Sequence, residues 1–256
     1  MNYSYTAMKS FTDCKYAFKL GYLDRVSREN NAFSDFGIAV HKVLEAFFSG
    51  YVEQRDLANH FLVTFDRIVV NEFPPSGDFD MKQYYRNTGF DFFSRFEFDK
   101  ERYKVMRAEG ALFWQEGNLK LNARPDLLLE DKVTGEIILL DYKTAKLKTL
   151  PHEKEKQMEE LGHQMRLYCR GLEKKMGIKV DKAHVWFVRK NKLVEVSNSP
   201  EEVEKTLKWL HDIRTAMGNE TEWTPNNTEE QAFYCNYICG VRNHCEYKKP
   251  MPETDE

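Results

Sequence analysis

The chain has 256 residues, of which 41% are hydrophobic and 14% aromatic, and its formal net charge is −3 from 38 basic and 41 acidic side chains. This length suits one large domain or two small ones with a real core, and the aromatic content excludes extensive disorder. The near-neutral charge excludes a globally basic nucleic-acid binder, so any contact with DNA must come from a local patch.

The N-terminus and the absence of long apolar runs favour an intracellular protein without a membrane partner. The first residues, MNYSYTAMKSFTDC, lack the apolar stretch of a signal peptide, and no run is long enough to span a membrane. We therefore expect a cytoplasmic protein that is nucleoid-associated or acts in a phage-infected cell. In a reducing compartment its five cysteines are better explained as ligands or buried thiols than as disulfides.

Helical patterns begin the chain. An aromatic segment over residues 4–21 predicts a helix, and Cys14 within it is either a packed thiol or a ligand. In residues 36–51 apolar side chains recur at helical spacing, with His41 and Glu45 one turn apart. A lone histidine on a helix is usually structural, so His41 indicates a site only in company with other ligands.

Two further helices are expected before the first strand. One covers residues 57–73 and is stopped by Pro74-Pro75, and a second, rich in Phe and Tyr, covers residues 81–104. These rings fit core packing better than the stacking of bases in a single-strand channel. A strand over residues 105–114 follows.

Residues 121–143 predict two strands joined by a tight turn at residues 131–135. The apolar run 137–140 is typical of a strand that is buried on both faces. Asp126 is expected within the first of these strands, directly after Pro125, which limits how the strand can pair there.

Charged side chains follow the second of these strands. Asp141 and Lys143 are two residues apart and therefore project to the same side. Burying them is costly unless they are paired or bind something. Carboxylates from adjacent strands, Asp126 and Asp141, can hold a hard divalent cation, and a lysine beside it can stabilise a phosphate or position the attacking water. The alternative is that these residues are solvated strand caps.

The C-terminal half predicts a long helix over residues 153–176, ended by Gly177. Gln164 and Tyr168 are four residues apart in it and can point to the same face. Two paired strands and a last helix follow, at residues 183–189, 193–196 and 200–217.

The last segment, FYCNYICGVRNHCEYKKP, holds Cys235, Cys239 and Cys245 within eleven residues. Thiols this close together in an intracellular protein indicate a shared metal, although unrelated thiols are the alternative. The candidates for a fourth ligand are Cys14, Cys169 and His244.

Together these motifs resemble the RecB-type PD-(D/E)XK nucleases, in the branch that includes the AddB nuclease domain and the small CRISPR-associated RecB-like exonucleases. The matching pieces extend over nearly the whole chain. In chain order they are Ser10-x-x-x-Cys14, Gly37-x-x-x-His41-x-x-Leu44-Glu45, Pro125-Asp126, Asp141-Tyr142-Lys143-Thr144, Gln164-x-x-x-Tyr168 and the terminal cysteines.

The resemblance implies a role for each residue. Mg²⁺ or Mn²⁺ would be held by His41, Asp126, Asp141 and the backbone carbonyl of Tyr142. Lys143 would act with the two aspartates as the catalytic lysine that orients or activates the water. Gln164 and Tyr168 would contact DNA beside the scissile phosphate.

In the iron–sulfur members of the branch, four cysteines carry a four-iron, four-sulfur cluster (4Fe–4S) that staples the two ends of the chain. By resemblance these would be Cys14, Cys235, Cys239 and Cys245. The family leaves two residues between the first two C-terminal cysteines, whereas three separate Cys235 from Cys239 here. Zinc, or no metal, therefore stays open at this site, and Cys169 is expected to be a buried thiol.

The expected fold is a restriction-endonuclease-like α/β core, with a central mixed sheet flanked by helices. Residues 105–217 would form this nuclease core. Residues 1–104 would form a helical part with the first cysteine and His41, and residues 218–256 a cysteine segment that packs on the N-terminus. We expect one integrated domain.

The hypothesis is a metal-dependent DNA exonuclease, a phosphodiester hydrolase acting on single-stranded ends in DNA repair, recombination or phage DNA metabolism. A helicase, integrase or recombination partner would give it direction. The alternatives are a CRISPR spacer-processing nuclease, a non-catalytic DNA-binding or assembly subunit, and a redox sensor that uses the cysteines.

Overall fold

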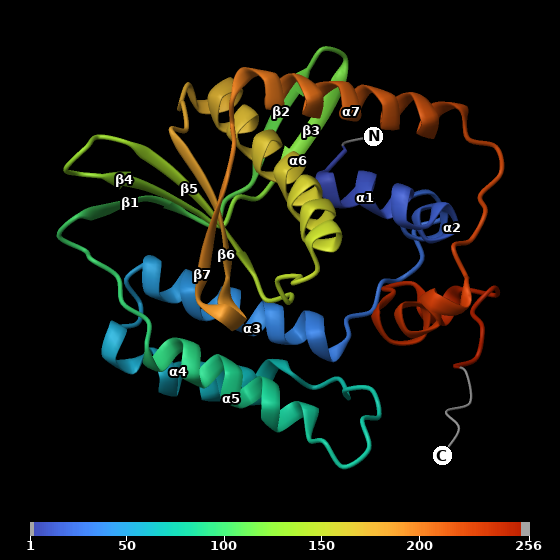
Figure 1. Ribbon diagram of the computed structural model, residues 1–256, viewed down its shortest axis with the longest axis horizontal. Coiled ribbons are helices and arrows are strands. Elements are labelled where there is room, and N and C mark those ends of the chain that lie inside the picture. Colours follow the sequence, from blue (N-terminus) through green and yellow to red (C-terminus); the bar gives the residue numbers. More distant parts are fainter. Residues whose placement is uncertain (1–2, 252–256) are drawn as a thin grey trace.

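A five-stranded mixed sheet lies at the centre of the computed structural model, which describes residues 3–251 (Figure 1). In spatial order the strands are β1 (Tyr103–Ala108), β4 (Leu127–Asp131), β5 (Ile137–Lys143), β6 (Lys182–Phe187) and β7 (Lys192–Val196). β5 and β6 are parallel, and the other neighbouring pairs are antiparallel. The predicted mixed sheet flanked by helices is confirmed.

Helices cover both faces of this sheet (Figure 1). One face carries α1 (Tyr5–Asp13), α6 (Pro151–Met176) and α7 (Pro200–Asn219). The other carries α3 (Ala32–Phe48), α4 (Leu57–Ile68) and α5 (Met81–Ser94). Because successive strand residues point to opposite faces, Leu139 packs in the first of these cores and Leu140 in the second. The continuous apolar run of β5 therefore does belong to a strand buried on both faces.

α6 makes the crossover that two parallel strands require, between β5 and β6. It ends at Gly177, whose φ of 67° lies in the left-handed region that glycine adopts without a steric penalty. The predicted helix and its glycine stop are confirmed.

The prediction of one helix over residues 4–21 is wrong, because the chain is extended at Cys14, with φ −160°. The Cys14 Sγ accepts a hydrogen bond from Ala17 N at 3.4 Å and so caps a new short helix, α2 (Lys15–Phe18). A π-helical turn, η1 (Lys19–Leu23), continues it. The thiol that interrupts the first helix thereby starts the second.

Two predicted strands are each divided in the structure. Residues 105–114 contain β1 and the start of β2 (Leu112–Glu116), separated by Glu109 at φ 46°. Asp126 was expected inside a strand, but it lies in the break between β3 (Leu119–Ala123) and β4. Pro125 cannot donate a ladder hydrogen bond, so pairing stops there, and β2 and β3 form a separate hairpin.

Two N-terminal helices are shorter than predicted. α4 ends at Ile68 rather than at residue 73. α5 ends at Ser94 rather than at residue 104, and the irregular chain after it carries Phe96 and Phe98. Both rings pack edge-on against Phe47 of α3, at 5.2 and 5.9 Å. Tertiary packing of aromatic side chains has here replaced the last helical turns.

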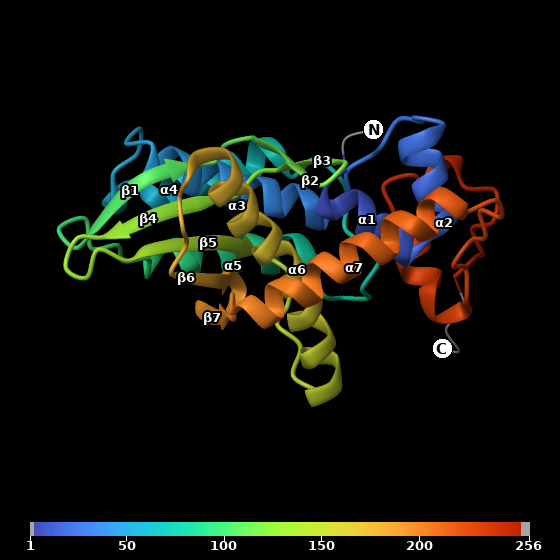
Figure 2. The ribbon, with the colours of Figure 1, turned by 90° about the horizontal axis from the view of Figure 1, so that it is seen from above.

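Between α7 and residue 251 the chain has only short helical turns, and both ribbon views place this segment beside α2 (Figures 1 and 2). The turns are η4 (Glu229–Gln231), η5 (Tyr234–Ile238) and η6 (Arg242–His244). Long-range hydrogen bonds attach this segment to the N-terminal part, including Glu29 N to Gly240 O at 2.8 Å and Tyr16 OH to Glu246 Oε1 at 2.8 Å. No helix within residues 3–251 is both long and apolar enough to cross a membrane.

Candidate active site

Helix α3 places His41 against the end of β5. Gly37, one turn earlier, faces Thr144, and a Cβ at Gly37 would lie only 3.1 Å from Thr144 Oγ1. Its absence lets the helix come close to the strand end. His41 Nε2 then lies 3.2 Å from the carbonyl oxygen of Tyr142. The Gly37-x-x-x-His41 spacing thus has a packing reason in the structure.

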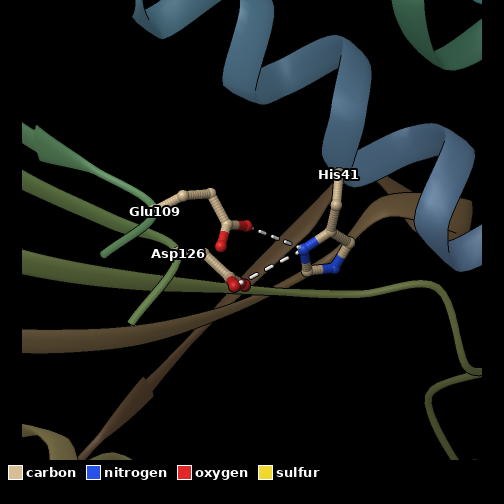
Figure 3. A group of neighbouring side chains, drawn as sticks. All are labelled: His41, Glu109 and Asp126. Carbon is tan, nitrogen blue, oxygen red and sulfur yellow. Dashed lines mark hydrogen bonds and ion pairs between the residues drawn. The ribbon is translucent and has the colours of Figure 1, made fainter. Parts of the chain in front are cut away.

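Two carboxylates converge on the other nitrogen of His41 (Figure 3). Its Nδ1 lies 3.4 Å from Asp126 Oδ1 and 3.5 Å from Glu109 Oε1. Donor atoms of these three residues all lie within 4.8 Å of one another, close enough to share one metal ion. Glu109 and Asp126 both come from the breaks that divide the predicted strands. The two irregularities of the sheet therefore build one side of the site.

The proton on His41 is strongly held in this environment. Burial lowers the pKa of His41, but the hydrogen bonds to Asp126 and Glu109 outweigh burial and raise the pKa to about 10. Both ring nitrogens face acceptors, which suits the doubly protonated imidazolium. A position that attracts a proton this strongly is also one where a divalent cation can replace it.

Asp141 is buried, with 2% of its surface exposed, at the end of β5. Its Oδ2 lies 2.6 Å from Lys143 Nζ as an ion pair, and within the described residues no other group donates a hydrogen bond to this oxygen. Burial raises the pKa of Asp141 to about 6, and Lys143 only partly offsets this effect. A buried carboxylate whose one neighbouring donor is an ammonium group keeps lone pairs free, as a metal ligand requires.

At the end of β5 the backbone of Tyr142 contacts the site, whereas its ring packs in the core on the opposite face of the sheet. Asp126 Oδ2 accepts a hydrogen bond of 2.6 Å from Tyr142 N, which ties the break before β4 to β5. The ring of Tyr142 packs among Phe48 and Trp186 in the opposite core, away from Asp141. The carbonyl of Tyr142 faces His41 Nε2, and the edge-on contact of the two rings, with centroids 5.5 Å apart, also packs Tyr142 against His41.

The Gln164–Tyr168 pair comes from α6. Gln164 Nε2 donates to Tyr168 OH at 2.6 Å, and each residue is 8% exposed. Gln164 lines the same cavity as Lys143, of about 420 Å³. Tyr168 lines a second cavity of about 290 Å³. Burial raises the pKa of Tyr168 far above its usual range, so this side chain stays a neutral phenol.

Four of the five cysteines line one cavity of about 360 Å³. They are Cys14, Cys235, Cys239 and Cys245. Cys169 is buried within α6, away from them. The extra residue between Cys235 and Cys239 lies in η5, a π turn closed by a hydrogen bond from Cys239 N to Tyr234 O at 2.8 Å. A π turn holds one more residue than an α turn, which accommodates the insertion.

Glu109 is the one residue of this site that the sequence analysis missed. It lay inside what looked like a continuous strand, and only the following Gly110 indicated a break. Strand periodicity could not show that the chain turns at Glu109 and directs a carboxylate to α3.

Comparison with solved structures finds proteins of similar length, one of which shares the fold of this chain. A crystal structure described as "Putative exonuclease" from Eubacterium rectale is 13% identical, with a TM-score of 0.54, over 100% of this chain and 91% of that one. The protein SSO0001 is 14% identical, with a TM-score of 0.36, over 95% and 96% of the two chains. At these identities the likeness to the first concerns the fold alone.

Sequence comparisons give a family. No curated protein matches the chain. A family model for the PD-(D/E)XK nuclease superfamily matches residues 2–246, which include the histidine, aspartates and lysine described above as well as the four cysteines of the shared cavity. The chain belongs to the PD-(D/E)XK nuclease superfamily.

Proposed function

We propose that the protein is a Mg²⁺- or Mn²⁺-dependent DNA exonuclease that hydrolyses phosphodiester bonds at single-stranded ends. Its setting would be DNA repair, recombination or phage DNA metabolism, with a helicase, integrase or recombination partner that supplies the end. The observation that carries the proposal is the buried Asp141 carboxylate, which is paired with Lys143 and interacts electrostatically with the His41–Asp126 pair.

The proposed metal ligands are the side chains of His41, Asp126 and Asp141 and the carbonyl of Tyr142, with Glu109 as an additional carboxylate. Imidazole, carboxylate and carbonyl donors suit Mg²⁺ and Mn²⁺. When bound, the ion supplies Lewis-acid stabilisation of charge on the phosphoryl oxygens. Without a metal ion His41 holds a proton, and we expect metal binding to release this proton.

Lys143 is the proposed catalytic lysine. In the reaction a water oxygen bonds to phosphorus, one phosphorus–oxygen ester bond breaks, and the leaving oxygen takes up a proton. The Lys143 side chain is 24% exposed, and its ammonium is anchored by Asp141 at 2.6 Å. This position lets it orient the water and stabilise the negative charge that develops on the phosphate.

Gln164 and Tyr168 are the proposed DNA contacts beside the scissile phosphate. Their neutral amide and phenol can donate hydrogen bonds to phosphate oxygens without adding charge. The single-strand preference is supported by the cavity that Lys143 lines, because α1, α6 and the C-terminal segment bound it. A space of about 420 Å³ between these elements suits one strand better than a duplex.

The four cysteines of the shared cavity are proposed to hold a 4Fe–4S cluster. These four thiols line one cavity, and four cysteine thiolates are the ligand set of such a cluster. A tetrahedral zinc site with the same four thiolates is the alternative.

The test is a nuclease assay on end-labelled single- and double-stranded DNA, with Mg²⁺, with Mn²⁺ and with EDTA. Asp141→Asn and Lys143→Ala should each reduce turnover about a thousandfold. The exposed pair Lys104–Glu130, 2.9 Å apart on β1 and β4, supplies matched controls, Lys104→Ala and Glu130→Gln, which should retain activity. The label's position gives the polarity. No cleavage of any substrate by folded, metal-loaded protein would contradict the proposal and favour the non-catalytic subunit.

A further inference from the structure

The cavity beside Lys143 reaches from the candidate active site to the cysteines. Lys143 and Gln164 line one end of it, and Cys14, Arg28 and Tyr234 line the other. The neighbouring cavity with the four cysteines shares several of these wall residues, among them Cys14 and Tyr234. A ligand that fills the cavity beside Lys143 therefore contacts residues that also line the cysteine cavity.

Arg28 differs from the other cations of this cavity. Lys9 is bound to Asp13 at 2.9 Å and to Glu160 at 3.0 Å, and Lys143 is paired with Asp141. Within residues 3–251, Arg28 makes neither an ion pair nor a side-chain hydrogen bond, although Asp13 and Glu160 line the same cavity. An exposed guanidinium with all its donors free is well suited to a phosphate, which it can bind with two parallel hydrogen bonds.

The position of Arg28 is fixed from two sides. Its guanidinium carbon lies 5.0 Å from the ring centroid of Tyr22, a cation–π distance. On the other side the C-terminal segment holds the backbone around it, through Glu29 N to Gly240 O at 2.8 Å and Arg242 to Asn30 O at 2.9 Å. Gly240, which follows Cys239, lies so close that a Cβ there would be 3.5 Å from Arg28 Nε.

We propose that Arg28 binds a backbone phosphate of the single nucleic-acid strand in this cavity, at a nucleotide other than the one cleaved, and that the cysteine segment positions Arg28 for this contact. The inference rests on the proposed nuclease function and adds a substrate-binding residue to it. The ring of Tyr234, 40% exposed at the same end, offers a surface on which a base can stack. The cysteine site then acts on substrate binding through Arg28.

The first test measures binding of a labelled oligo-dT strand in EDTA over a range of salt concentrations. Arg28→Ala should weaken binding about tenfold at low salt, as expected for one charge-assisted contact. A plot of the logarithm of the association constant against the logarithm of the salt concentration has a negative slope. The magnitude of this slope should decrease by about 0.7, the value for one phosphate contact on a single strand. Arg28→Lys should restore part of both. The control is Arg214→Ala, an exposed arginine of α7 outside the cavity, which should change neither. An unchanged Kd and slope in Arg28→Ala would overturn the inference.

A small substrate separates this inference from the proposed function. Bis(p-nitrophenyl) phosphate has one phosphodiester group and cannot span the cavity, so Arg28→Ala should hydrolyse it as the wild type does while its KM for oligo-dT rises about tenfold. If the wild type hydrolysed neither substrate, the proposed function itself would fail. A loss of both activities in Arg28→Ala would point to a structural role instead.

A double-mutant cycle tests whether the cysteine segment positions Arg28. Cys239→Ser should weaken oligo-dT binding at least as much as Arg28→Ala, and adding Arg28→Ala to Cys239→Ser should weaken binding no further, because the Arg28 contact is already lost. Additive losses would refute the link. If Cys239→Ser does not fold, Arg242→Ala, which removes the bond to Asn30 O, replaces it in the cycle.

Discussion

The proposed nuclease site and the cysteine site are neighbours that are built in different ways. The first takes its groups from α3, β5, α6 and two turns at the sheet, and Asp126 and Asp141 are buried within it. The second takes its sulfurs from irregular chain at both ends of the protein, and all four are half-buried. The comparison shows that a hydrophobic core can hold charged groups in place even though burying them costs free energy. A segment without such a core needs other interactions to keep its backbone ordered.

The burial of apolar side chains makes this difference concrete. β5 alone buries Leu139, Leu140 and the ring of Tyr142 next to the charged residues. In the described part of the chain after α7, only Ala232 and Val241 are buried apolar residues. Two such side chains contribute about 3 kcal/mol at most, far less than the entropy lost on ordering some thirty residues. The proposed nuclease site is therefore preformed, and we expect the order of the C-terminal segment to depend on the proposed metal cluster.

The largest expected effect is the loss of order in that segment when its ligand is removed. Cys235→Ser should make the chain after residue 219 sensitive to trypsin by more than an order of magnitude, while residues up to 219 stay resistant. Limited proteolysis followed by mass spectrometry measures the sites of cleavage. Cys169→Ser, in the buried thiol of α6, is the matched control and should leave the segment protected. Equal resistance of Cys235→Ser and wild type would remove the contrast between the two sites.

The second effect is a fall in the stability of the metal-free protein as pH rises. The folded pKa of His41 is about 10, above the ordinary 6.5, so its stabilisation is complete below pH 6.5 and is lost as pH approaches 10. The pKa of Asp141 is raised from 3.8 to about 6, so the folded state alone keeps this proton between pH 4 and 6, and stability falls across that window too.

Together these two groups should lower the free energy of unfolding by about 5 kcal/mol between pH 5 and 9. Urea unfolding in EDTA measures it. In His41→Gln most of the decrease above pH 6.5 should disappear, and saturating Mn²⁺ should oppose the decrease in the wild type because it replaces the proton. A stability that rises with pH in EDTA would show that the site is not held together by this proton.

The smallest expected effect concerns Glu109, the carboxylate that the sequence analysis missed. Glu109→Gln removes one charge from the site but keeps the shape of the side chain, and Asp126 still faces His41. We expect Mn²⁺ affinity to fall about tenfold to a hundredfold, with the fold unchanged. Isothermal titration measures it, with Glu130→Gln as the control. Wild-type affinity in Glu109→Gln would restrict the metal ligands to those expected from the sequence.

Much of the fold could be predicted because its signals are local. The apolar run of β5, the turn after β4 and the helix ended by Gly177 each depend on residues close together in the chain. The boundaries failed where distant groups competed with the local pattern. α5 stops early because Phe96 and Phe98 find Phe47, and the first helix breaks because the Cys14 sulfur accepts hydrogen bonds from Ala17 N and Asn226 N.

The sequence by itself determined the chemistry of the protein: an aspartate and a lysine two residues apart at a strand end, a histidine on a helix, and cysteines at both ends. Only the tertiary structure decided that Glu109 joins His41 and Asp126, and that Arg28 faces the cavity of Lys143 with its donors free. The physical reason is that a residue type and its spacing fix which bonds a side chain can form. Which partner it meets depends on long-range packing, here the approach of α3 at Gly37 and the attachment of the last segment to residues 29–31.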